Sequence, residues 1–246
     1  MYIINQAMRN DFINELTGNN KYYYVSVLPH LSIKHYEDIK FSAIKLYMIG
    51  VPFDNQGKTR QERMESEKDI DATLTPFVEK IWKYFNEKPN TTNNQIEFDR
   101  FHDELCDLFL VSFESAGYIH TYGNAQKMVN MLFKYLTCYK DYERFAGLFN
   151  FCHIPIDRKI LQDFFALNVP NTTRYGEYQE LMSSAVTTPW TRMGKRQYYI
   201  LVAAYRTALD DIKGGNSWLG MEYYIWAGLD IPTTGVHAVK KSKFYM

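Results

Sequence analysis

Apolar residues recur at intervals of three and four along most of this 246-residue chain. The clearest run begins near Ala125, where six apolar side chains keep helical spacing: Met128, Met131, Leu132, Tyr135, Leu136 and Tyr139. This spacing puts the side chains on one face of an α-helix, and that face must pack against a core. The sequence therefore predicts an all-α fold, which we expect to form two helical lobes with a cleft between them.

Turn residues divide the periodic pattern into separate helices. We expect long helices over residues 36–49, 75–85, 98–113 and 195–212, with further helices beginning at Asp157 and near Trp218. On the third of these, one face carries Phe98, Phe101, Leu105, Leu108 and Phe109. Residues 53–71 are predicted to be an exposed loop running into a solvated helix start, and residues 168–189 a loop with a short helix.

Composition sets limits on the class of protein. Hydrophobic residues make up 46% of the chain and the formal net charge is zero, which is typical of a folded globular protein. A neutral chain is not coated in basic surface, although a local basic cleft remains compatible with it. We expect residues 1–246 to form a single unit, because this length can bury one core or two small lobes.

The spacing of the cysteines and the length of the apolar runs predict the redox compartment of the protein and its relation to membranes. Cys106, Cys138 and Cys152 have no Cys-x-x-Cys spacing, which argues against a zinc knuckle or a four-cysteine iron–sulfur cluster. We therefore expect reduced thiols, no metal and no cofactor. The first twenty residues lack the apolar core of a signal peptide, and no run is long enough to cross a bilayer. The expectation is a cytoplasmic monomer that does not enter a membrane.

Two short motifs carry the candidate chemistry. Gly123-Asn124-Ala125-Gln126-Lys127 delivers a lysine to the start of a helix, and Ile154-Pro155-Ile156-Asp157 presents a carboxylate thirty residues later. An amine and a carboxylate in one cleft can perform nucleophilic and acid–base chemistry at the same carbon. Taken separately, each motif has an ordinary explanation: the first as a plain helix–helix connection, and Asp157 as a helix N-cap.

Together the two motifs resemble the helix-hairpin-helix DNA glycosylases over residues 113–165. Their hairpin reads roughly Gly-x-Gly-x-Lys, and their catalytic aspartate lies in a Val-Pro-Val-Asp-like segment. The resemblance implies that Lys127 attacks C1′ of a flipped nucleotide and that Asp157 stabilises the positive charge there. It also implies that Tyr122, Gly123, Asn124, Ala125 and Gln126 form a phosphate-binding hairpin.

This chain departs from the family pattern in two places. Ala125 stands where the second hairpin glycine is usual, and Thr121-Tyr122 replaces the usual Pro-Gly pattern before the first. The interval between lysine and aspartate is similar to that of the archaeal 8-oxoguanine glycosylase branch. Residues 139–151 must therefore fold back to return Asp157 to Lys127.

Other residues are candidates for holding DNA. Arg158, Arg192 and Lys195 could contact phosphates, and Trp190, Trp218 and Trp226 could line a base pocket. Each has a structural alternative: basic residues near helix starts are often plain surface, and the Trp218, Glu222 and Trp226 stripe could be core with a tethered carboxylate. Cys152-His153 has no ligand partner at helical spacing, so His153 is a DNA contact or a local polar group.

The sequence thus predicts a DNA glycosylase, with or without Schiff-base lyase activity, that serves in repair or in defence against phages with modified bases. The alternative is a non-enzymatic helical module that binds nucleic acid or a protein partner. An RNA-directed enzyme is not separated from these by sequence. Walker A, dinucleotide, HExxH and GxSxG motifs are absent from the chain.

Overall fold

The computed structural model describes residues 60–88, 94–137, 142–158, 160–161, 189–211, 217–220 and 222. The elements that they form are α3 (Arg60–Glu87), α4 (Gln95–Ser115), α5 (Tyr122–Leu136), η2 (Tyr142–Phe145), α6 (Ala146–Phe149), η3 (Trp190–Arg192) and α9 (Lys195–Asp211). Within these ranges the regular structure is entirely helical, which confirms the all-α prediction there. The helix expected over 36–49, most of the segment 168–189 and Trp226 lie outside the described residues.

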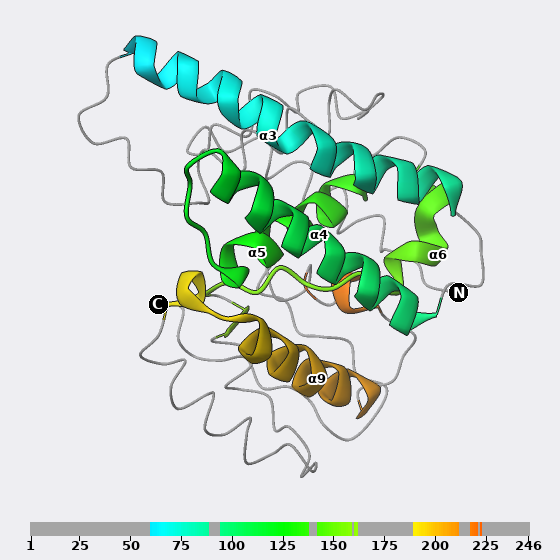
Figure 1. Ribbon diagram of the computed structural model, residues 1–246. Coiled ribbons are helices and arrows are strands. Elements are labelled where there is room, and N and C mark those ends of the chain that lie inside the picture. Colours follow the sequence, from blue (N-terminus) through cyan, green and yellow to red (C-terminus); the bar gives the residue numbers. More distant parts are fainter. Residues whose placement is uncertain are drawn as a thin grey trace, which may run out of the picture.

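Helix α5 lies at the centre of the described part of the molecule. It packs against α4, η3 and α9, and α4 in turn packs against α3 (Figure 1). All but two of its residues are buried, the exceptions being Lys127 and Met131. The helix that carries the candidate lysine is therefore fixed on several sides.

Aromatic rings hold α3, α4 and α5 to the short helices that follow. Phe133 of α5 lies 5.6 Å from Phe85 of α3 and 5.4 Å from Phe98 of α4, measured between ring centroids. Phe85 also contacts Phe145 and Phe149. Tilted and edge-to-face ring pairs of this kind add stability beyond the area that they bury. Packing of η2 and α6 on this cluster turns the chain back toward α5.

The expected helix over 98–113 is present as α4, and its predicted apolar face is the buried one. Phe98, Phe101, Leu105 and Phe109 are buried, and Leu108 packs at their edge. The helix begins after Asn94, whose side chain accepts a hydrogen bond from the Glu97 N–H, as N-cap residues do.

Helix α3 corrects the prediction for residues 53–71. An exposed loop running into a solvated helix start was expected there, with a separate helix over 75–85, but α3 is one helix that begins at Arg60 and contains Pro76 in its interior. Proline in a helix removes one backbone donor, so it signals a helix start more often than a helix interior. The charged residues that precede Pro76 in α3 include Glu, Lys and Arg, which are good helix formers. Their polarity alone led to the expectation of an exposed loop.

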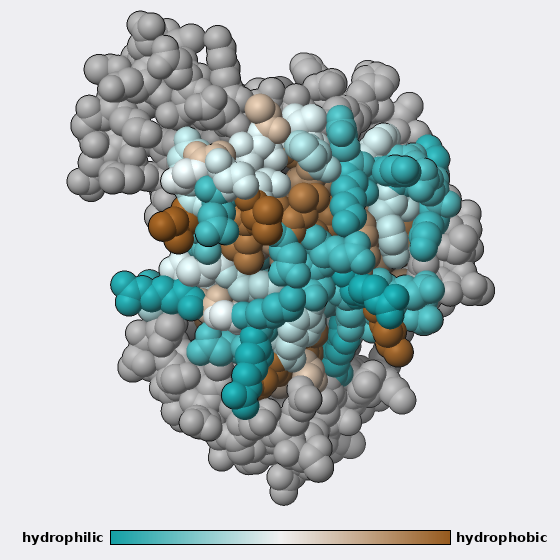
Figure 2. Space-filling model, in the orientation of Figure 1, coloured by the Kyte–Doolittle hydropathy of each residue, from teal (hydrophilic) through white to brown (hydrophobic). Residues whose placement is uncertain are grey.

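Hydrophilic side chains are prominent on one face of the described part. On the face shown in Figure 2, hydrophilic side chains cover most of the described area, with smaller hydrophobic areas between them. The large exposed hydrophobic side chains in the described ranges include Ile96, Val111 and Ile119. Among the helices that the structure describes, none combines the length and the apolarity that a membrane span requires.

Candidate active site

Lys127 and Asp157 meet in the folded chain. Lys127 lies near the start of α5, and Asp157 ends the extended run 152–157 that follows α6. The Lys127 Nζ atom is 2.6 Å from Asp157 Oδ2, and the two side chains are 15% and 20% exposed. Residues 142–149 fold back as η2 and α6, and the closure predicted from the sequence is present. The catalytic roles of the two residues stay predictions.

Asp157 uses its second carboxylate oxygen for the chain itself. Oδ1 accepts a hydrogen bond of 3.0 Å from the Ile160 N–H, which is the geometry of an N-cap. The N-cap interpretation of Asp157 is therefore confirmed, and the other carboxylate oxygen pairs with Lys127. Burial by itself would raise the pKa of the Asp157 carboxyl, but the Lys127 ammonium, the Ile160 N–H and Lys134 hold that pKa below its usual value. The carboxylate is ionised throughout the neutral range.

The predicted phosphate-binding hairpin has a different structure. Tyr122 through Gln126 are buried and form the first turn of α5, which begins at Tyr122 and not near Ala125. Thr121 caps the helix, and the turn between α4 and α5 comes earlier, over residues 116–121. In this structure the five residues predicted to hold DNA phosphate are therefore enclosed by protein, which does not agree with direct contact.

A segment around η3 covers this first turn. The Gly123 N–H donates to the Met193 carbonyl oxygen over 2.8 Å, and the Thr121 hydroxyl donates to the Thr191 carbonyl oxygen. A Cβ atom on Gly123 would lie 2.0 Å from the Trp190 carbonyl oxygen. Glycine is therefore needed here for close approach of two backbones, not for approach of a phosphate.

The predicted basic contacts differ in their surroundings. Arg158 is exposed directly after Asp157, and Arg192 is exposed in η3. Lys195 is bonded to carboxylates of α4, at 2.7 Å from Asp103 and 3.2 Å from Asp107. Two acidic partners compete with any phosphate for Lys195, which weakens it as a DNA contact.

Of the predicted base-pocket tryptophans, the structure describes Trp190 and Trp218, and these two contact different parts of the chain. Trp190 packs with its backbone over Gly123, and Trp218 lies under the Arg206 guanidinium, whose central carbon is 3.9 Å from the ring centroid. Trp218 also meets the His153 ring edge-to-face, at a centroid distance of 5.8 Å. The Trp218 contacts with Arg206 and His153 belong to a different polar cluster from the Lys127–Asp157 pair.

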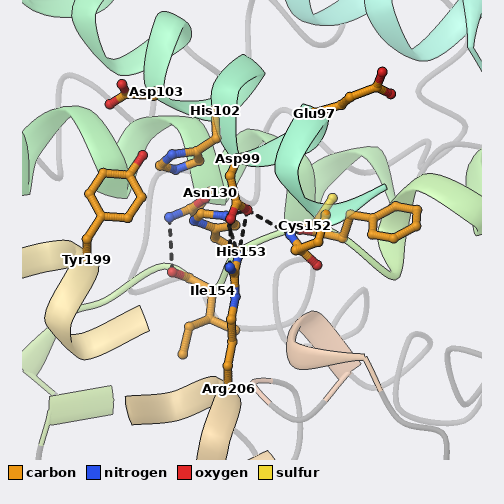
Figure 3. Close-up of polar contacts among 12 residues, drawn as sticks. Glu97, Asp99, His102, Asp103, Asn130, Cys152, His153, Ile154, Tyr199 and Arg206 are labelled. Atoms are coloured by element: carbon orange, nitrogen blue, oxygen red, sulfur yellow. Dashed lines mark hydrogen bonds and ion pairs between the residues drawn. The ribbon is translucent and has the colours of Figure 1, made fainter. Parts of the chain in front are cut away.

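That cluster joins α4, the run 152–157 and α9, and sequence reasoning missed it. His153 Nε2 lies 2.8 Å from Asp99 Oδ1, and Arg206 donates two hydrogen bonds of 2.6 Å to the same carboxylate (Figure 3). The Tyr198 hydroxyl is 2.7 Å from His153 Nδ1 and 3.2 Å from His102 Nε2. His153 thus holds its segment between two helices.

In this cluster the Asp99 carboxyl is ionised and the two histidine rings are neutral. Burial would raise the pKa of the Asp99 carboxyl, but hydrogen bonds from His153 and Arg206 hold the pKa well below its usual range. Burial lowers the pKa of both the His102 and His153 imidazoles, so both rings are neutral near pH 7. The spacing of these five residues in sequence gave no signal, because they meet only through packing.

A second lysine–carboxylate pair lies farther along α5. Lys134 Nζ is 2.6 Å from Glu222 Oε2, and each side chain is 1% exposed. Burial lowers the pKa of the Lys134 ammonium, and the Glu222 carboxylate partly opposes that shift. Glu222 is thus the tethered core carboxylate that the sequence allowed. The available signal for its partner was a lysine within the otherwise apolar run 131–136.

No group of His, Cys, Asp or Glu side chains in the described ranges has the arrangement of a three-ligand metal site. Cys152 donates instead to the Leu148 carbonyl oxygen at 3.5 Å, and burial raises the pKa of its thiol. No family model, curated protein or solved structure gives a significant match to this chain. The functional case therefore depends on the geometry of Lys127 and Asp157.

Proposed function

We propose that the protein is a DNA glycosylase that removes a damaged or modified base from a flipped-out nucleotide, with Lys127 as nucleophile. The single observation that carries the proposal is the Lys127–Asp157 pair, at 2.6 Å and with both side chains partly exposed. A carboxylate and an amine that are in contact and reachable from solvent can act together on one sugar carbon. The proposal includes two lobes with a cleft, a helix-hairpin-helix at α4–α5 and a cytoplasmic location.

The ionised pair suits each stage of base removal. The bond from C1′ to the base breaks, and its electron pair leaves with the base. The Lys127 ammonium supplies the proton that the departing base needs, which frees the Nζ lone pair to bond to C1′. Asp157 remains a carboxylate, in keeping with its lowered pKa, and stabilises the positive charge that develops at C1′. The bond from C1′ to the ring oxygen then breaks, a second amine proton passes to that oxygen, and the nitrogen lone pair forms the C=N bond of a protonated Schiff base.

Borohydride trapping tests this directly. The wild-type protein is incubated with DNA duplexes that carry a panel of damaged and phage-type modified bases, in parallel with Lys127→Gln. Lys83→Gln is the matched control, because Lys83 is a 73% exposed lysine far along α3. A covalent adduct in wild type and Lys83→Gln, absent in Lys127→Gln, supports a bifunctional glycosylase. Alkali-labile abasic sites without an adduct support a monofunctional enzyme that uses water and Asp157.

Two results would overturn the proposal. An adduct that persists in Lys127→Gln assigns the chemistry to another amine. No adduct and no abasic site on any substrate favours the second candidate, a non-enzymatic helical binding module. Two observations favour that candidate: the Asp157 cap on Ile160 and the enclosed first turn of α5 give both motifs a structural use.

A further inference from the structure

We infer that Gln126 is the positioning residue for Asp157, because its side-chain amide clamps the backbone of Ile156 and thereby sets the carboxylate against Lys127. The assignment of a catalytic consequence rests on the proposed function, whereas the clamp itself does not. Nothing in the sequence motif required this role, since Gln126 was expected to face a phosphate. In the structure it is fully buried.

The amide makes a two-point contact with one residue. Gln126 Nε2 donates to the Ile156 carbonyl oxygen over 2.7 Å, and Gln126 Oε1 accepts from the Ile156 N–H over 3.1 Å. Nε2 also donates to the Gly123 carbonyl oxygen at 3.0 Å, which fixes the amide against its own helix. A side chain bonded at both ends allows only one register of the run 152–157 along α5.

Asn130, one helical turn later, extends the clamp. Its Nδ2 atom donates to the Ile154 carbonyl oxygen over 3.0 Å (Figure 3), and it also lies 3.2 Å from Gln126 Oε1. The groups held are those of Ile154 and Ile156, which alternate as in a strand. Pro155 lies between them and has no N–H, so no backbone donor is left without a partner at that position.

This register explains why the pair forms. Gln126 holds Ile156, and the next residue on each segment is Lys127 on α5 and Asp157 on the extended run. If the clamp were lost, the buried N–H and carbonyl of Ile156 would lose these two partners. Such groups are costly to leave unpaired, so the run would shift toward water and carry Asp157 with it.

The first test measures the position of Lys127 without requiring activity. Reductive methylation of the folded protein is followed residue by residue by mass spectrometry in wild type and in Gln126→Met, which keeps the length of the side chain and removes its hydrogen bonds. We expect methylation of Lys127 to rise about tenfold, the factor that corresponds to about 1.4 kcal/mol. Lys83 is the exposed reference, and buried Lys134 reports any general opening of the fold.

Two outcomes of this test would overturn the clamp. Unchanged methylation of Lys127 means that the pair forms without Gln126. A parallel rise at Lys127 and Lys134 means that the substitution loosens the whole fold, so that Gln126 is a packing residue only. A rise at Lys127 alone supports positioning.

The second test uses Gln126→Glu and the rate of base release in a single turnover. A protonated Glu offers one carbonyl acceptor and one O–H donor, enough for both hydrogen bonds to Ile156 although not for the one to Gly123, whereas an ionised Glu repels the Ile156 carbonyl. Burial raises the pKa of such a carboxyl, so we expect the rate relative to wild type to recover as pH falls from 8.5 toward 6.5, with DNA affinity unchanged. A pH-independent ratio contradicts the clamp. If wild type releases no base, the proposed function fails while the methylation test still judges the clamp.

Discussion

Helix α5 carries two lysine–carboxylate pairs of equal length in opposite environments. Lys127–Asp157 and Lys134–Glu222 are each joined at 2.6 Å, and the lysines lie seven residues apart on the helix. The first pair is partly exposed and the second is almost wholly enclosed. The N–O distance therefore does not separate the pair that we propose to be reactive from the enclosed pair, whereas solvent exposure does.

The difference in access changes what each pair can do. A pair that is sealed from water must remain together, because either charge left alone in a low-dielectric interior is very costly. A partly exposed pair, such as Lys127–Asp157, can separate and exchange its partner for a substrate at a smaller cost, because water reaches both groups. Lys134 is therefore fixed in place by its burial, and Lys127 is the lysine that a nucleotide could reach.

The largest expected effect tests the enclosed pair. Glu222→Gln leaves the Lys134 ammonium without its counter-charge, and we expect the free energy of unfolding to fall by about 3–5 kcal/mol. Denaturation with urea measures it. The double variant Lys134→Met with Glu222→Leu should recover much of the loss, because an apolar pair of similar volume needs no counter-charge. Equal losses in the single and double variants would contradict this account.

The next effect tests the exposed pair through activity. Asp157→Asn should slow base release by about 100- to 1000-fold, because the charge that stabilises C1′ is removed. Asn remains a good N-cap, so unfolding should change little, whereas Asp157→Ala should cost about 1 kcal/mol. Single-turnover rates and urea denaturation on the same samples separate the two roles. An unchanged rate of base release in Asp157→Asn would mean that Asp157 acts only as a helix N-cap.

The third prediction concerns how tightly the segment around η3 packs on the first turn of α5. Gly123→Ala places a methyl group against the Trp190 carbonyl oxygen, and we expect a loss of about 1–3 kcal/mol, the usual cost of overpacking. Gly194→Ala is the matched control in the same segment, because the nearest atom to its added Cβ is 3.9 Å away. Thermal unfolding of both variants measures the difference. Equal stabilities would show that the η3 segment can move aside.

The last prediction is a pH dependence in which the fold is lost before Asp157 loses its charge. Burial lowers the folded-state pKa of His102 and His153, and that of His120 to about 4. The unfolded chain therefore binds more protons below about pH 6.5, so stability is lost as pH falls, by up to about 1.4 kcal/mol per histidine per pH unit.

Asp157, whose pKa is also lowered, keeps its charge over that range. Loss of activity on mild acidification should therefore follow unfolding, not protonation of Asp157. Circular dichroism and base release measured across pH 7 to 4 should decline together. Activity lost while the fold is intact would contradict the order.

Much of the helical framework could be predicted from the sequence. The apolar spacing of residues 98–109 and 128–136 identifies the buried faces of α4 and α5, because a helix places residues three and four apart on one side. The start of α3 was misplaced, since Pro76 gives a local signal that the surrounding helix overrides.

Of the candidate site, the sequence identified some residues and missed others. Lys127 and Asp157 could be singled out because a lysine after a small-residue turn and an aspartate after a proline are recognisable as types. The role of Gln126 could not, because it depends on the register between two segments thirty residues apart. Nor could the meeting of Asp99, His153 and Arg206, which come from three separate segments.

The sequence by itself determined that the described chain is helical, which faces are apolar, and which amine and carboxylate could react. Only the tertiary structure decided that these two groups touch, that the predicted hairpin residues are enclosed, and that Lys134 is paired and buried. The physical reason is that periodicity acts over a few residues of one helix. Burial, pKa and partner choice are set by whatever other segments pack against that helix.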